Sequence, residues 1–171
     1  MAEALTFTEL NKQQKGLLNS LNGAANSLLA LLNDVLDFSK LESGKLEIER
    51  TSLSLERLVE SVCDSLESLA KQRNIDIHPF VDPALPKQVL ADEVRLRQVL
   101  NNLVGNAIKF SYPDSEIKIS LKSVSGKIVI SVEDHGQGIL SKDQSQIFEP
   151  FVVSNAKGTA GEKSTGLGLS I

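Results

Sequence analysis

The chain has 171 residues, of which 41% are hydrophobic and 23% charged, and this composition is typical of a folded globular protein. Its formal net charge of -4 argues against a general binder of nucleic acids or of anionic membranes. A single cysteine excludes an internal disulfide, and no apolar run is long enough to span a bilayer.

Residues 8–42 are predicted to form one long helix that ends at Ser43-Gly44, a C-terminal stop signal. Apolar residues recur along it at alternating spacings of three and four, as in a heptad seam. The seam consists of Leu18, Leu21, Ala25, Leu28, Leu32 and Val35. A second apolar row runs beside it, and this width favours a bundle completed by another chain over a single amphipathic helix lying on its own domain.

The middle of the chain alternates between strands and helices. The expected elements are an edge strand at 45–50, a helix from 55 to 71–74, strands at 75–81 and 89–90, a helix from 93 to 110, strands at 116–123 and 127–133, and a short helix near 143–148. Ser52 or Ser54 is the expected cap of the first of these helices, and Asp92 that of the second. Ser125-Gly126 supplies a hairpin turn. This order predicts an α+β fold with helices on one face of a mixed, largely antiparallel sheet.

One helix face carries residues suited to chemistry. Asn102, Asn106, Lys109 and Phe110 follow the spacing i, i+4, i+7 and i+8, so they project from the same side. Amide oxygens can ligate a hard cation, and a lysine can neutralise phosphate oxygens, so this face suits a nucleotide phosphate with its metal. The alternative is an ordinary helix with two satisfied asparagines.

Two glycine-containing segments follow. In Asp134-His-Gly-Gln-Gly138 the carboxylate can accept a hydrogen bond from an exocyclic amine, and the glycines permit close approach to a flat ligand. A simple exit from the preceding strand explains this pattern equally well. Thr165-Gly-Leu-Gly-Leu169 offers backbone amides to an anion in a similar way. The segment 158–164 looks like a phosphate-binding loop, but its spacing fails and no strand precedes it.

Taken in order, NLVGNAIKF, EDHGQGI, IFEPF and STGLGLSI resemble the four ATP-binding boxes of sensor histidine kinases. These kinases belong to a superfamily that also holds gyrase, the ninety-kilodalton heat-shock chaperones and the mismatch-repair ATPases. LLALLNDVLDFSKLESGKLEIE resembles their second dimerisation helix and linker, and RLRQVLNNLVGNAIKF and FEPF are similar to the hybrid-type kinases. The resemblance implies a two-layer α/β sandwich of the Bergerat type, in which ATP lies between the helices and a mobile lid.

The resemblance also implies a division of the chain and a set of cofactors. Residues 1–43 would be the second helix of a dimerisation hairpin whose first helix is absent, and residues 44–171 an ATP-binding catalytic domain truncated at its C-terminus. The cofactors would be ATP and Mg²⁺. The implied cofactor-binding residues are Asn102, Asn106, Lys109, Phe110, Asp134, Gly136, Gly138, Ile139, Phe151, Thr165, Gly166, Leu167, Gly168 and Leu169.

Several of these residues receive particular roles from the resemblance. Asn106 would ligate magnesium, with Asn102 close to the phosphates or the metal. Asp134 would accept from the adenine amine, and Phe148 and Phe151 would anchor the lid. The loop lysines at 157 and 163 are interpreted as solvated rather than as phosphate ligands.

The departures from the family pattern limit the expected activity. Gyrase-type members carry a water-activating glutamate at the position of Asn102, so kinase chemistry is favoured over hydrolysis. Neither His78 nor His135 matches the phosphoacceptor motif, so this chain alone should not autophosphorylate. We expect a γ-phosphoryl transfer to a histidine elsewhere, with relay to a receiver aspartate.

The expected partners are a second copy of the chain, bound through residues 8–42, and a response-regulator receiver domain. No nucleic acid and no membrane contact is expected for this segment, and the expected location is cytoplasmic. The alternative functions are a non-catalytic dimerising module that binds a kinase or a receiver, and a gyrase-type ATPase.

Overall fold

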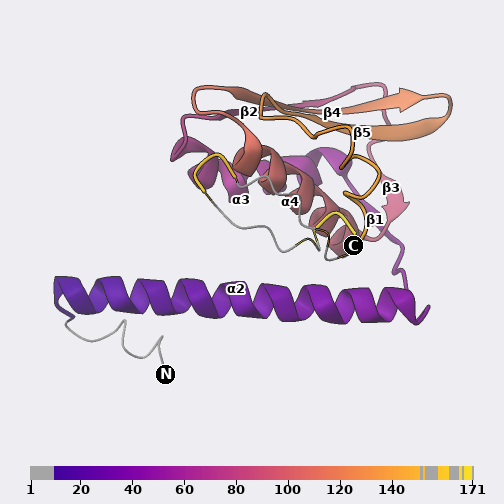
Figure 1. Ribbon diagram of the computed structural model, residues 1–171. Coiled ribbons are helices and arrows are strands. Elements are labelled where there is room, and N and C mark those ends of the chain that lie inside the picture. The colour runs from indigo at the N-terminus through magenta and orange to yellow at the C-terminus, as the bar shows by residue number, and fades with distance from the viewer. Residues whose placement is uncertain (1–9, 151, 153–157, 162–165, 167, 171) are drawn as a thin grey trace. The chain divides into compact units, whose positions relative to one another are not determined.

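The computed structural model describes residues 10–150, 152, 158–161, 166 and 168–170. The chain divides into two compact units, residues 1–46 and residues 47–171, which are described separately (Figure 1). Among the helices of the described part, none combines the length and the apolar character needed to cross a membrane.

The first unit contains one helix, α2 (Lys12–Glu42). Asn11 and Gln14 form a capping box, in which each side chain accepts a hydrogen bond of 2.9 Å from the other residue's backbone N–H. The prediction that this helix begins at residue 8 is therefore wrong, because the cap sets its start. Gly44 adopts φ 65°, and the N–H groups of Gly44 and Lys45 donate to carbonyls of the last turn, which confirms the predicted stop.

The second unit is a mixed α and β layer structure. Its elements are β1 (Thr51–Leu53), α3 (Leu55–Lys71), β2 (Asp76–Val81), β3 (Val89–Ala91), α4 (Glu93–Phe110), β4 (Glu116–Val124) and β5 (Lys127–Glu133). Strands β2 and β4 pair in parallel and β4 and β5 pair antiparallel, while β1 and β3 form a separate antiparallel pair. Helices α3 and α4 cover one face of the three-stranded sheet (Figure 1). The predicted fold class, with its mixed sheet, is confirmed.

Two expected elements were placed wrongly. Residues 45–50 form no strand, and the strand begins at Thr51 because only Thr51–Leu53 pairs with β3. The segment 143–148 forms overlapping turns rather than a helix. There the N–H groups of Asp143 and Gln146 donate to the carbonyls three residues earlier, and no continuous ladder of helical bonds follows.

One hydrophobic cluster joins the two helices to the sheet. Its most buried members include Val59, Val62, Leu100, Val104, Ile108, Ile117, Ile119 and Leu121. Residues 117, 119 and 121 alternate along β4, so they point to the same face of the sheet. Full burial of such a side chain contributes about 1.5–3 kcal/mol relative to leaving it exposed. This cluster fixes α4 against the sheet and thereby sets which of its faces can serve a site.

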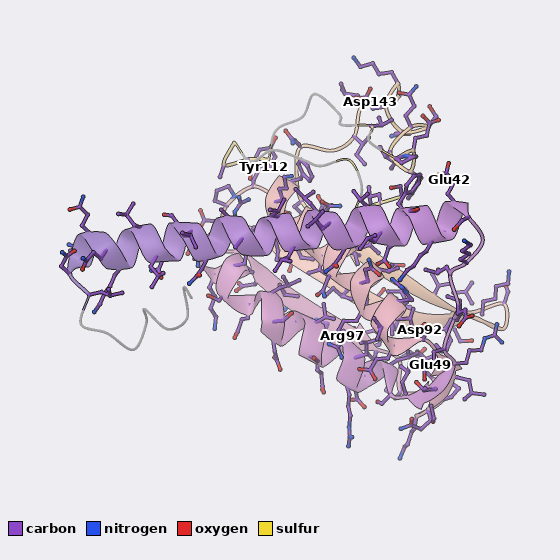
Figure 2. The ribbon with its side chains drawn as sticks, turned by 90° about the horizontal axis from the view of Figure 1, so that it is seen from below. Glu42, Glu49, Asp92, Arg97, Tyr112 and Asp143 are labelled. Atoms are coloured by element: carbon purple, nitrogen blue, oxygen red, sulfur yellow. The ribbon has the colours of Figure 1, made fainter. Side chains whose placement is uncertain are left out.

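Asp92 fixes the start of α4. One carboxylate oxygen accepts from the backbone N–H of Arg95, and the other accepts from that of Glu49, each over 3.0 Å. Asp92 and Glu49 are labelled close together in Figure 2. These two backbone donors are the main reason that the pKa of Asp92 lies below its usual value. The predicted cap is confirmed, and it also ties the segment before β1 to the helix.

Candidate functional site

Helix α4 separates packing residues from polar ones. Its fully buried side chains belong to the hydrophobic cluster and are Leu100, Val104, Ala107 and Ile108. The side chains predicted to bind a ligand are half-buried and are Asn102, Asn106, Lys109 and Phe110. Half-buried polar groups on a rigid, well-packed helix are held in place and remain within reach of a ligand.

The ammonium group of Lys109 is partly buried, beside an aromatic ring and near a second cation. Its Nζ atom is 5.1 Å from the centroid of the Phe110 ring, which is cation–π geometry. Burial, and then the nearby charge of Arg73, lower the pKa of Lys109. An anionic group placed near Lys109 would offset both effects, so this position suits a phosphate.

The segment Asp134–Gly138, called the DxG segment below, is docked on the C-terminal end of α4. Ser111 and Gly136 form an isolated antiparallel bridge, and the N–H of Gln137 donates to the carbonyl of Phe110 over 3.3 Å. One carboxylate oxygen of Asp134 accepts from the N–H of Gly136 over 3.0 Å. These contacts fix the carboxylate of Asp134 relative to the helix.

The two glycines of the DxG segment are required for different reasons. A Cβ atom on Gly136 would clash with the carbonyl of Phe110 and lie 2.8 Å from a carboxylate oxygen of Asp134. The close approach that requires Gly136 is therefore to the helix, whereas the sequence suggested an approach to a ligand. Gly138 adopts φ 67°, a conformation that favours glycine.

The last glycine segment reaches the middle of α4. A Cβ atom on Gly168 would lie 3.7 Å from Cγ of Asn102 and within 4 Å of both of its amide heteroatoms. Gly166 adopts φ 74°, and Leu169 is half-buried. Gly168 thus lies close to the side-chain amide of Asn102, and backbone and side-chain amides are groups that can hold phosphate oxygens and a magnesium ion.

The remaining predicted residues either have largely exposed side chains or lie outside the described residues. Ile139 and Phe148 are 49% and 65% exposed. Phe151, Thr165 and Leu167 lie outside the described residues, as do the two loop lysines.

Sequence reasoning did not identify Arg73 and Thr159, which also contact the last turn of α4. A nitrogen of Arg73 donates to the carbonyls of Ile108 and Lys109 over 2.9 and 3.1 Å. Thr159 lies 50 positions from Lys109 in the chain and still meets it. Contacts between such distant positions leave no signal in a periodic pattern.

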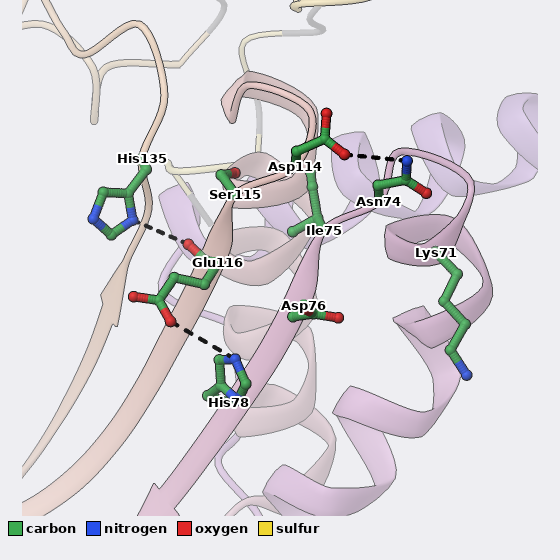
Figure 3. Close-up of a pocket in the computed structure, with 9 residues that line it drawn as sticks. All are labelled: Lys71, Asn74, Ile75, Asp76, His78, Asp114, Ser115, Glu116 and His135. Carbon is green, nitrogen blue, oxygen red and sulfur yellow. Dashed lines mark hydrogen bonds and ion pairs between the residues drawn. The ribbon is translucent and has the colours of Figure 1, made fainter.

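A separate pocket of about 780 Å³ lies where β2 and β4 begin (Figure 3). Glu116 joins two histidines there: its carboxylate lies 3.7 Å from Nε2 of His78, and its carbonyl lies 3.1 Å from Nδ1 of His135. A hydrogen bond from Lys118 is the main cause of the lowered pKa of Glu116.

Among the residues that the structure describes, no cluster of His, Cys, Asp and Glu could hold a metal ion. Only His135 belongs to a predicted nucleotide-binding segment, so this pocket is distinct from the convergence of Asn102 and Gly168.

Comparisons with known proteins agree with this geometry. The family model for the histidine kinase-, DNA gyrase B-, and HSP90-like ATPases matches residues 91–171. The histidine-protein kinase BarA of Escherichia coli K12 is 37% identical over 168 residues, which are 96% of this chain and 18% of BarA. The chain therefore spans about a fifth of the length of that relative.

Two solved structures extend the comparison. Full-length ShkA in complex with AMPPNP gives a TM-score of 0.78 at 34% identity, covering 99% of this chain and 35% of ShkA. The catalytic domain of the histidine kinase ThkA gives a TM-score of 0.60 at 34% identity, covering 73% of this chain and 76% of that domain. The chain belongs to the histidine kinase-, DNA gyrase B- and HSP90-like ATPase family, and it contains a catalytic domain of the histidine kinase kind.

Substitution of Gly136 tests the docking of the DxG segment on α4. Gly136→Ala should lower the free energy of unfolding by about 1–3 kcal/mol, because the new Cβ meets the carbonyl of Phe110. Gly105→Ala is the matched control, since nothing lies within 4 Å of its Cβ position, and it should stabilise α4 by about 0.5–1 kcal/mol. Urea denaturation measures both values. Equal stability of the two variants would contradict the described docking.

Proposed function

We propose that this chain binds ATP with magnesium and acts as the catalytic part of a histidine kinase. The observation that carries the proposal is the closeness of Gly168 in the last glycine segment to Asn102 on α4, where a Cβ atom on the glycine would lie 3.7 Å from Cγ of the asparagine. The DxG segment, docked on the C-terminal end of the same helix, supports it. The AMPPNP bound in the similar structure of ShkA supports the choice of an adenine nucleotide.

The roles of the individual residues follow from their chemistry. Asn106 would hold magnesium through its amide oxygen, with Asn102 beside the metal or the phosphates. Lys109 would neutralise a phosphate oxygen, and Asp134 would accept from the adenine amine. Magnesium, when bound, supplies charge neutralisation on the phosphates. Catalysis by the protein itself would then consist mainly of positioning and of donors held ready in place.

The composition of α4 favours phosphoryl transfer over hydrolysis. Its single carboxylate, Glu93, lies in the first turn and pairs with Arg97 over 2.7 Å. The side chain beside Gly168 is the amide of Asn102, which cannot take a proton from water. A gyrase-type hydrolysis would need a general base at that position.

The phosphoacceptor is proposed to be a histidine outside this sequence. His78 lies within β2, and His135 lies in the DxG segment against the carbonyl of Glu116, so neither stands on a helix that could be presented to ATP. From the acceptor, the phosphoryl group would pass to a receiver aspartate. ThkA was also solved in complex with the response regulator protein TrrA, and over the longer ThkA chain of that structure the identity is 28%. That complex supports a partner of this kind. We place this step in the cytoplasm.

Helix α2 is proposed to form part of a dimerisation bundle. Many of its large apolar side chains are more than a third exposed: Leu17, Leu21, Leu28, Leu29, Leu31, Leu32, Val35, Leu36 and Leu41. All of these except Leu41 lie on one side of the helix, and an apolar stripe of this extent needs a partner to remove it from water. The same stripe favours the alternative function, a non-catalytic module that only dimerises and binds a kinase or a receiver.

Phosphorylation in trans separates the two functions. The chain, mixed with Mg-ATP and a separate acceptor hairpin that carries a histidine, should phosphorylate that histidine.

The variant Asp134→Asn tests the assigned nucleotide site. It should weaken the binding of a non-hydrolysable ATP analogue about tenfold or more, because it removes a charged acceptor. Asp64→Asn, at an exposed position on α3, is the control and should bind normally. Nucleotide binding without any phosphorylation would favour the non-catalytic module, and binding unaffected by Asp134→Asn would refute the assigned site.

Charged substitutions on α2 test the dimer. The double variant Leu21→Glu with Leu28→Glu places two charges in the seam and should shift the chain towards monomer in sedimentation velocity. The control, Asn19→Glu with Asn33→Glu, adds the same charge on exposed positions outside the seam and should leave the distribution unchanged. A wild-type chain that sediments as a monomer at all concentrations would argue against dimerisation through α2.

A further inference from the structure

The segment Gly158–Gly161 is fastened to the last turn of α4 by Thr159. The backbone N–H of Thr159 donates to the carbonyl of Lys109 over 3.0 Å. Its hydroxyl lies 2.8 Å from the carbonyl oxygen of Ser111 and 3.2 Å from that of Lys109. Gly158, directly before it, is buried. A single residue therefore joins this segment to the turn that carries Lys109.

Arg73 completes this contact from a third segment, the turn after α3. Its Nη1 atom donates to the carbonyls of Ile108 and Lys109 and also to the hydroxyl oxygen of Thr159, the last over 3.2 Å. Because the hydroxyl oxygen accepts from Arg73, its hydrogen is directed to a carbonyl, and that of Ser111 is the nearest. A cation at the C-terminal end of a helix is also favourable to the helix dipole.

We propose that Arg73 and Thr159 form a latch that positions the nucleotide site. The latch holds residues 158–161 against the turn with Lys109 and Phe110. This inference rests on the proposed nucleotide binding, and it assigns Arg73 and Thr159 as positioning residues that touch neither substrate nor metal.

The hydroxyl group of Thr159 makes the most important hydrogen bond of the latch, to the carbonyl of Ser111. Ser111 is fully buried, so water cannot easily replace a donor that is lost from its carbonyl. Valine has the shape of threonine and lacks that donor, whereas serine keeps it. The alternative is a purely structural role, in which Thr159 and Arg73 only cap α4. In that case they would contribute to stability and leave nucleotide affinity unchanged.

Calorimetric titration with a non-hydrolysable ATP analogue tests the latch in the whole chain. Thr159→Val should weaken binding about three- to tenfold, the range expected for loss of one hydrogen bond. Thr159→Ser should bind within about twofold of wild type. Thr51→Val, at an exposed position of β1, is the matched control for the substitution itself and should bind as wild type. Arg73→Gln is a second variant, should Thr159→Val fail to fold, and it should weaken binding in the same direction.

Two results would overturn the latch. One is equal affinity of Thr159→Val and wild type, and the other is equally weak binding by Thr159→Ser and Thr159→Val. If the wild-type chain binds no nucleotide, the proposed function fails first, and hydrogen exchange then decides on the latch alone. Faster exchange of residues 158–161 in Thr159→Val than in Thr159→Ser would support it, and equal exchange would exclude it.

Discussion

The organisation of this chain depends on how the carbonyl groups at the C-terminal end of α4 find partners. A helix leaves its last carbonyls without intrahelical donors, and buried carbonyls must be satisfied elsewhere. Here the donors come from several other segments: Arg73 for Ile108, Arg73 and Thr159 for Lys109, Gln137 for Phe110, and Thr159 for Ser111. The DxG segment, the turn after α3 and the segment 158–161 are therefore all gathered at one helix end. The need of these carbonyls for hydrogen-bond donors therefore determines which segments surround the candidate site.

Much of the fold could be predicted from the sequence, because it depends on local signals. Periodicity located α3 and α4, Asp92 and Ser54 capped them as expected, and Ser125-Gly126 turned the hairpin with both residues at positive φ. The strand expected at 45–50 was misplaced because alternation alone cannot say where a partner strand lies. The helix expected at 143–148 failed for the related reason that composition does not ensure a continuous hydrogen-bond ladder.

The sequence indicated which residues belong to the candidate site, but it did not indicate which of them lie against one another. The order of the motifs, through the family resemblance, indicated Asn102, Asp134 and Gly168, but no spacing rule places Gly168 against Asn102. Gly136 was assigned to ligand approach, whereas its neighbour is the carbonyl of Phe110. That glycine shows how one residue type can be required for packing within a site that also serves chemistry. Arg73 and Thr159 act over long sequence separations and carried no motif at all.

The central claim is that ATP and magnesium bind where α4 meets the last glycine segment, and nuclear magnetic resonance can test it directly. Mg-ATP is titrated into the ¹⁵N-labelled chain while side-chain and backbone amide signals are followed. We predict that the side-chain amides of Asn102 and Asn106 shift together with the backbone amides of Gly136 and Gly168. Shifts confined to the pocket around His78 and Glu116, or no shifts at saturating Mg-ATP, would contradict the account.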